Sequence, residues 1–172
     1  YAISSAQDLA NLSYLVNNGT LYAGKYFKMT DNIVLNDGTF DAVGTFTPTI
    51  GGTAVRTWTP IGIFKQPDPD FGVIDPRSFR GSFDGDGYII SGLYINNALN
   101  YQGLFGEVES GLVTDLGVEN SYIKSNNSVG GITAVVRQDA IISGCHYTGY
   151  IIANSQAGGI AGALYGGAVS NC

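Results

Sequence analysis

Charged residues are scarce in this chain of 172 residues, and histidine and cysteine are scarcer still. Asp, Glu, Lys and Arg make up 13% of the sequence, against about a quarter in an ordinary globular domain. The single histidine, His146, excludes a zinc site built on several histidines, such as His-Glu-x-x-His. No run of about 18 apolar residues occurs, so the sequence predicts no transmembrane helix and no membrane insertion of this segment.

The negative net charge of the chain argues against some classes of binding partner. The chain has 14 acidic and 8 basic residues, a net charge of −6. Nucleic acids and anionic membranes attract basic surfaces, so we expect neither as a partner. An acidic balance is compatible with divalent cations.

Glycine, by contrast, is abundant, with 25 residues, and it recurs with a fixed period. The same interval separates Gly103 from Gly131 and Gly131 from Gly159, and it also relates Leu104, Ile132 and Ile160. A fixed period of about 28 residues is typical of solenoids, in which each coil buries its apolar face against the next coil. The sequence therefore predicts an all-β fold, a parallel β-helix with about 28 residues per coil.

Two further strand families support this interpretation. The pattern apolar-x-x-apolar occurs in the segments 90–95, 113–118, 142–147 and 169–172, and a third family relates 121–126 to 149–154. We place 79–84 in the glycine-centred family, which makes the first coil, from Gly81 to Gly103, shorter than the others.

The start of the chain predicts a helix that covers the open end of the stack. Ser5 is a typical N-cap with Asp8 three residues later, Leu9, Leu12, Leu15 and Val16 share one helical face, and Asn18-Gly19 ends the helix. Strands are expected at 26–29 and 33–35. A capping helix would protect the exposed sheet edge.

We therefore expect one β-helix block over 1–172 in three parts. Residues 1–35 form the helix cap and lead-in strands, 36–78 an irregular, loop-rich segment and 79–172 the repeat coils. All five prolines lie in the middle part, where 68–75 is expected to be an exposed acidic loop. No charged residue follows Asp139, so we expect further coils or another domain of the same chain to continue the stack.

The two cysteines, Cys145 and Cys172, lie about one repeat apart. Equivalent residues on neighbouring coils are about 4.8 Å apart. Two alternatives follow: a disulfide between coils, or two small side chains buried in the same core ladder.

Several segments resemble bacterial secreted and cell-surface proteins with GLUG-motif repeats: Trp58–Gly62, Phe79–Gly87, Ile90–Leu93, Gly103–Gly106, Gly130–Thr133 and Gly158–Gly162. The lead-in segments 6–12 and 26–35 also match. The resemblance implies a right-handed β-helix, in line with the usual hand of parallel crossovers. It also implies a secreted or bacterial cell-surface location, as in adhesin-like proteins and non-catalytic regions of IgA-specific metallopeptidases. The family specifies no catalytic residues, and the insertion at 63–78 and the degenerate Gly131–Ala134 depart from its pattern.

Two sites are candidates for ligands. Asp84 and Asp86, in Asp-Gly-Asp-Gly, could share a calcium ion as the one cofactor we consider, or form a tight corner between strands. Tyr94, Tyr122 and Tyr150 recur at the interval of the glycines, so their rings could stack as a platform for sugars or proteins, or pack for stability.

Three functions follow from these observations. The first is a non-enzymatic surface module for adhesion, ligand presentation or scaffolding, with a host or bacterial surface glycan or protein as partner. The second is a carbohydrate-active enzyme of the β-helix type, a polysaccharide lyase or glycosidase, which would use Asp68, Asp70 and Asp75 with Arg77 and Arg80. In that case the acidic loop would carry acid and base groups instead of being merely solvated. The third is an inert spacer.

Overall fold

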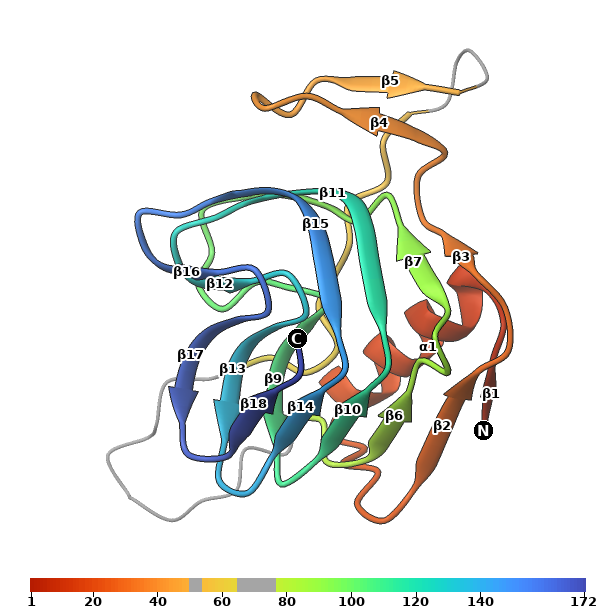
Figure 1. Cartoon of the computed structure of the whole chain (residues 1–172), viewed down its shortest axis with the longest axis vertical. Coiled ribbons are helices and arrows are strands. Elements are labelled where there is room, and N and C mark those ends of the chain that lie inside the picture. The colour runs from red at the N-terminus through yellow and green to blue at the C-terminus, as the bar shows by residue number, and fades with distance from the viewer. Residues whose placement is uncertain (50–53, 65–76) are drawn as a thin grey trace.

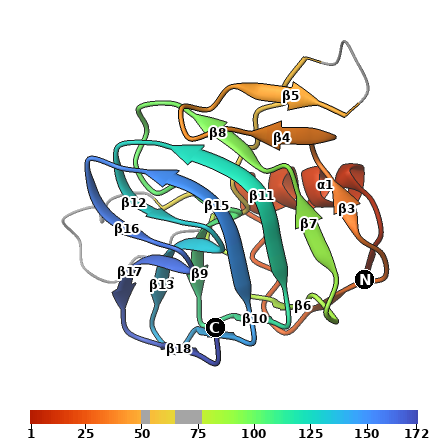
Figure 2. The same ribbon diagram turned by 45° about the horizontal axis from the view of Figure 1, so that its top comes forward.

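The computed structural model of the chain describes residues 1–49, 54–64 and 77–172. Short strands follow one another around each coil, and successive coils stack side by side (Figure 1). Each of these strands pairs in parallel with a strand of the neighbouring coil. The predicted all-β parallel β-helix is confirmed: the chain is a parallel β-solenoid with about 28 residues per coil and one N-terminal helix. Figure 2 shows the same stack from a second direction, with the coils running in order from the N-terminal to the C-terminal strands.

The strands form several sheets along the stack. The largest sheet has the order β1 (Ala2–Ile3), β2 (Tyr26–Met29), β6 (Ser82–Asp84), β10 (Leu112–Thr114), β14 (Ile141–Ser143) and β18 (Ala168–Ser170). The second contains β3 (Ile33–Val34), β7 (Ile89–Ser91), β8 (Tyr94–Asn96), β11 (Gly117–Lys124) and β15 (His146–Ile152). The others pair β12 (Asn127–Gly130) with β16 (Ser155–Gly158), and join β9 (Phe105–Glu109), β13 (Thr133–Arg137) and β17 (Ala161–Tyr165).

The register of the strands confirms the repeat. Thr133 lies opposite Phe105 in the preceding coil and Ala161 in the following coil, an offset of one repeat each way. Tyr122 has the same relation to Tyr94 and Tyr150. Equivalent positions are therefore direct neighbours, as a stacked solenoid requires.

Two strand equivalences expected from the sequence are wrong. Phe83 pairs with Val113, so β6 belongs to the large sheet and not to the glycine-centred family. Ile90 pairs with Val118 and not with Val113. The short first coil inferred from Gly81 and Gly103 therefore does not exist, because Gly81 lies beside Gly111. Both errors have one cause: short apolar motifs look alike, and only hydrogen bonding between coils fixes their register.

The core consists of apolar ladders along the inside of the stack. Phe83, Val113 and Ile142 are fully buried in one ladder, and Ile95 and Ile123 in another. Each coil covers the inward side chains of its neighbour, which removes them from water at about 25 cal/mol per Å² of apolar surface. The apolar ladders therefore hold the coils together.

Helix α1 (Ala6–Asn17) closes the N-terminal part of this core. Its buried face, Leu9, Leu12 and Val16, joins the same apolar cluster as the first strands. The Ser5 Oγ accepts from the Asp8 N–H (3.2 Å), which confirms the predicted cap. The Asp8 carboxylate accepts from the Ser4 N–H (3.0 Å), and this bond lowers the pKa of Asp8. The edge of the large sheet is formed by strand β1, which precedes the helix.

The middle segment is more ordered than the sequence predicts. Its first part forms an antiparallel hairpin of β4 (Gly38–Phe40) and β5 (Phe46–Pro48), which stands above the solenoid in Figure 1. Residues 54–64, which we call the strap, then run beside the coils. The Ile61 N–H donates to the Leu104 carbonyl (2.9 Å), and Ile61 pairs in parallel with Phe105. The strap thus takes the place of a strand beside β9.

A substitution at Gly92, at the corner between β7 and β8, tests how closely the backbones of neighbouring segments pack. Its φ is +74°, and a Cβ there would overlap the backbone oxygen of Asn36. We expect Gly92→Ala to lower the free energy of unfolding by about 2 kcal/mol, as measured by urea denaturation. Gly159→Ala is the matched control, because a Cβ at Gly159 meets nothing within 4 Å. Equal losses in the two variants would contradict the packing described here.

Candidate functional site

The three tyrosines are in the predicted register, but they do not form an open platform. The rings of Tyr94 and Tyr122 stack at 5.8 Å, and Phe40 of β4 stacks on Tyr94 at 5.2 Å. The Tyr122 hydroxyl donates to the Val43 carbonyl (3.3 Å), and Tyr122 is 1% exposed. The β4–β5 hairpin therefore covers the ladder, and of the three rings only that of Tyr150, 43% exposed, is open.

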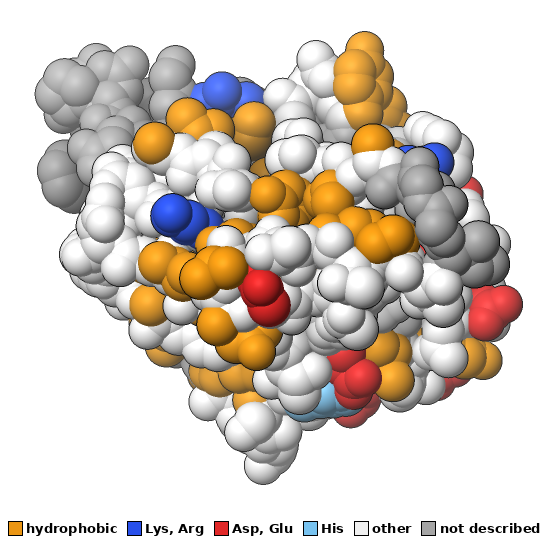
Figure 3. Space-filling view, turned by 90° about the horizontal axis from the view of Figure 1, so that it is seen from above, with side chains coloured by type: hydrophobic (Ala, Val, Ile, Leu, Met, Phe, Trp, Pro, Cys, Tyr) orange, Lys and Arg blue, Asp and Glu red, His pale blue; other side chains and the backbone are white. Residues whose placement is uncertain are grey.

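Figure 3 shows this face of the molecule from above. Hydrophobic side chains gather over its middle, where the hairpin and the β11–β15 sheet lie in Figure 1. At the lower edge the histidine lies against acidic side chains, in agreement with the His146 Nε2 to Glu119 Oε1 distance of 2.8 Å. His146 occupies an exposed strand position and contacts this carboxylate.

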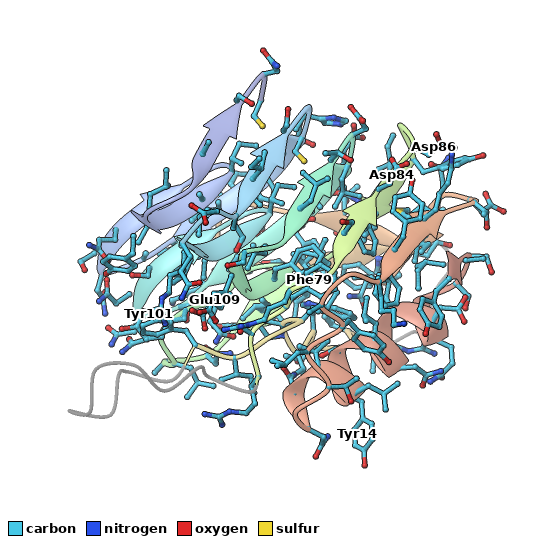
Figure 4. The ribbon with its side chains drawn as sticks, turned by 90° about the horizontal axis from the view of Figure 1, so that it is seen from below. Tyr14, Phe79, Asp84, Asp86, Tyr101 and Glu109 are labelled. Atoms are coloured by element: carbon cyan, nitrogen blue, oxygen red, sulfur yellow. The ribbon has the colours of Figure 1, made fainter. Side chains whose placement is uncertain are left out.

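Asp84 and Asp86 lie together at the end of β6 (Figure 4). The Tyr26 hydroxyl donates to Asp84 Oδ2 and lowers the pKa of that carboxyl, and Asp84 Oδ1 accepts from the Asp86 N–H (2.8 Å). Asp86 Oδ1 pairs with Lys28 Nζ at 3.0 Å, which raises the pKa of Lys28. The turn continues through Asp86 at φ +52° and Gly87 at φ +80°. These contacts are those of a strand corner, and a calcium ion would have to compete with Tyr26 and Lys28 for the same oxygens.

The structure brings together a group of charges that the sequence reasoning missed. Glu107 and Glu109 project from β9 and are 0% and 1% exposed. Arg80 Nη2 lies 2.5 Å from Glu109 Oε2, and Arg137 Nη1 lies 3.1 Å from Glu107 Oε1. Ser78 Oγ and Gln138 Nε2 also donate to Glu109, at 2.7 and 2.6 Å. The buried carboxylates are thus compensated by arginines from neighbouring segments of the stack.

This cluster has a signal in the sequence. Arg137 lies opposite Glu109 in the next coil, so opposite charges stand one repeat apart. The Arg137 guanidinium also lies 5.8 Å from the centre of the Phe64 ring, which packs on Tyr101 at 4.2 Å. These contacts attach the end of the strap to Arg137 of β13 and to Tyr101, which precedes β9. The two carboxylates are buried and engaged by arginines.

None of the three acidic residues proposed for an enzyme lies within the described residues. Asp68, Asp70 and Asp75, and most of the predicted 63–78 insertion, lie outside the described residues. Of the two arginines grouped with them, Arg80 pairs with Glu109. In the part of the chain that the structure describes, no three His, Cys, Asp or Glu side chains are grouped to hold a metal ion.

The cysteines lie on neighbouring coils, as predicted, and both are free. The Cys145 N–H donates to the Cys172 Sγ at 3.4 Å. Cys145 is buried, and burial raises the pKa of its thiol to about 12, whereas Cys172 is exposed. The expectation of two buried side chains is therefore met by Cys145 alone.

A groove begins along helix α1, between the helix and the strap, and continues beyond the helix between residues 34–37 and the start of the strap. It consists of three adjoining hollows with volumes of about 370, 350 and 390 Å³. The first and second share Ala10, Thr57 and Trp58, and the second and third share Leu35 and Arg56. The hollows therefore form one continuous depression.

Helix α1 provides one wall of the groove. Gln7, Ala10, Tyr14 and Asn17 recur at intervals of three and four residues, so they share one face of the helix. Tyr14 is 67% exposed, and Figure 4 shows it projecting from α1 on the side away from Asp84 and Asp86. Ala10 lies at the junction of the first two hollows, where its small side chain leaves the groove open.

The strap provides the other wall. Arg56, Thr57 and Thr59 are exposed along it, while Trp58 is 8% exposed and donates its ring N–H to the Leu104 carbonyl (3.0 Å). Ser13 Oγ donates to the Thr59 carbonyl (2.9 Å), which ties the helix to the strap. The two walls are thus joined by hydrogen bonds and by packing. The groove is a preformed surface with hydroxyl, amide and aromatic groups.

The buried and exposed ion pairs should contribute differently to stability. Replacing Glu109 by Gln leaves the Arg80 charge uncompensated, and we expect it to lower the free energy of unfolding by about 3 kcal/mol. The matched change Glu119→Gln removes an exposed pair and should cost less than about 1 kcal/mol. Urea denaturation measures both. A cost for Glu109→Gln as small as that for Glu119→Gln would show that Arg80 does not depend on Glu109 for compensation of its charge.

The thiols should also differ. Cys172 is exposed and should react with a disulfide reagent in the folded protein, whereas the buried Cys145, whose thiol pKa is raised, should react only after unfolding. The measurement is the number of thiols that react with a chromogenic disulfide, before and after addition of guanidinium. Reaction of both thiols at the same rate in the native protein would contradict the burial of Cys145.

Comparison with known proteins gives one partial similarity. No family model and no solved structure matches the chain. A region of 90 residues, 51% of the chain, is 31% identical to Halomucin from Haloquadratum walsbyi (strain DSM 16790 / HBSQ001). It corresponds to 1% of the length of Halomucin. Within the described residues, no helix has the length and apolar character needed to cross a membrane. The chain is thus similar to a short part of Halomucin, and its resemblance to GLUG-motif proteins stays a prediction.

Proposed function

We propose that the chain is a non-enzymatic, carbohydrate-binding module of a secreted or cell-surface protein, and that the groove along α1 is its binding surface. The groove is the observation that carries this proposal. Two of its three joined hollows follow the helix from Gln7 to Asn17, and the third continues past Leu35 and Arg56. A helical stretch of this length spans about 15 Å, which suits an extended ligand better than a single small molecule.

The chemistry of the groove favours sugars. Tyr14 offers an exposed aromatic face, against which the apolar face of a sugar ring can pack. Thr57, Thr59 and Asn18 line the groove beside it and offer hydroxyl and amide groups to the ligand's own hydroxyls. A mostly apolar hollow with a few polar groups is the usual form of a small-ligand site.

Binding without catalysis is supported by the way the chain uses its carboxylates. Glu107 and Glu109 converge with two arginines, but they are buried and engaged in ion pairs. A general acid or base must reach the bond that it acts on. A rigid solenoid that presents a groove is also the common way in which repeat proteins work.

Two partial sequence similarities support an extracellular location. One is the 31% identity of a 90-residue region to Halomucin, a protein whose name denotes a mucin. The other is the resemblance to the surface proteins with GLUG-motif repeats. Both agree with an adhesive or scaffolding role, in which further domains of the same protein would place this module.

A glycan array tests the proposal. The wild-type chain should bind a subset of oligosaccharides, and Ala10→Trp, which fills the middle of the groove, should reduce that binding by at least about tenfold, the loss of one good packing contact. Asn11→Trp is the matched control, because Asn11 is exposed on the same helix and does not line the groove.

The outcomes separate the alternatives. No binding to any glycan, or equal binding by the Ala10→Trp and Asn11→Trp variants, would refute the groove as the site. Cleavage of a polysaccharide that is lost when Asp68, Asp70 or Asp75 is replaced by Asn would favour the enzyme hypothesis instead. Repeating the array with a calcium chelator tests Asp84 and Asp86, since loss of binding would assign them a metal.

A further inference from the structure

Arg56 places a positive charge at one part of the groove. It lines both the second and the third hollow, and its side chain is exposed. None of the ion pairs within the described ranges 1–49, 54–64 and 77–172 uses its guanidinium. Arg80 and Arg137, by contrast, are committed to buried glutamates. Arg56 is therefore an available cation in the middle of a largely neutral groove.

The backbone at Arg56 is held in place by a buried amide. Asn36, 6% exposed, accepts from the Arg56 N–H at 2.7 Å and donates to the Arg56 carbonyl at 2.9 Å. The same side chain donates to the Gly92 carbonyl at 2.8 Å, which ties it to the corner between β7 and β8. The base of the arginine side chain is thus fixed before any ligand arrives, which reduces the entropy lost on binding.

The remaining charge in the groove limits where an anion can lie. Asp37 lines the third hollow together with Arg56 and repels a negative group placed deeper there. Towards the other end, Tyr14, Asn17, Asn18 and Thr59 present no charge. The net charge of −6 further disfavours a densely charged polyanion.

We infer that the groove binds an acidic oligosaccharide that carries a single carboxylate or sulfate on the segment bound, with this anion on the Arg56 guanidinium and its neutral sugars along Thr57, Thr59 and Tyr14. This inference rests on the proposed function and names its ligand class. The planar guanidinium matches two oxygens of one anionic group, and such charged hydrogen bonds are stronger than neutral ones.

The test pairs protein variants with ligand variants. The probes are a uronic-acid-containing tetrasaccharide with its carboxyl-reduced form, and a monosulfated galactose tetrasaccharide with its desulfated form. Isothermal titration calorimetry measures each against the wild-type protein and against Arg56→Gln, Arg56→Lys and Lys124→Gln. Lys124 is exposed, lies at the end of β11 and does not line the groove, so Lys124→Gln makes the same change in net charge elsewhere.

We expect the wild-type protein to bind an acidic probe at least about tenfold more tightly than its neutral form. Arg56→Gln should abolish that preference and leave the affinity for the neutral form unchanged, Arg56→Lys should keep part of it, and Lys124→Gln should keep all of it. The uronic and sulfated probes show which anion the site prefers. Unfolding curves that match the wild-type protein exclude a folding defect.

Three results would overturn the inference. One is equal affinity for the acidic and neutral forms. Another is a preference that survives in Arg56→Gln, and the third is an equal loss in Lys124→Gln, which would indicate a general charge effect. If Ala10→Trp still abolishes binding of the neutral forms in any of these cases, the groove remains the binding site and only the acidic ligand is wrong. If Ala10→Trp has no effect, the proposed function itself fails.

Discussion

Hydrogen bonding and side-chain stacking between neighbouring coils are the interactions on which the whole structure depends. A single coil has no apolar interior of its own, because its strands are short and face only one another across the coil. Once stacked, Phe83, Val113 and Ile142 form a continuous buried ladder, and each strand pairs with its equivalent about one repeat away. Stability is then a sum of contacts between neighbours, as in other repeat proteins.

At the N-terminal side of the stack, parts that do not repeat pack against the coils: helix α1 buries Leu9, Leu12 and Val16 against the core, and the strap places Ile61 beside Phe105. Two different elements that meet in this way do not fit as closely as two identical coils. The groove lies at their junction, so the candidate binding surface is a consequence of how the solenoid is closed.

The chain has few charged side chains, and several of them make ion pairs or hydrogen bonds within the fold. Glu107 and Glu109 hold arginines, Asp84 and Asp86 hold Tyr26 and Lys28, and Asp8 holds the first turn of the helix. These contacts lie between coils, at strand corners and at the helix start, and removing one partner of a buried pair would leave the other charge uncompensated. Arg56 differs from these residues, because none of the ion pairs in the described part of the chain uses its guanidinium, which is open to an anionic ligand.

The sequence by itself determined the solenoid, its period of about 28 residues, the helix over Ala6–Asn17 and its Ser5 cap, because these follow from local spacing and from equivalent residues that must stack. It also indicated the register of Tyr94, Tyr122 and Tyr150. Only the tertiary structure decided that the β4–β5 hairpin covers Tyr122, that Phe83 pairs with Val113, and that Glu109 meets Arg80. The groove was equally beyond prediction. All of these depend on contacts between segments without a shared period, and no local pattern specifies which of them meet.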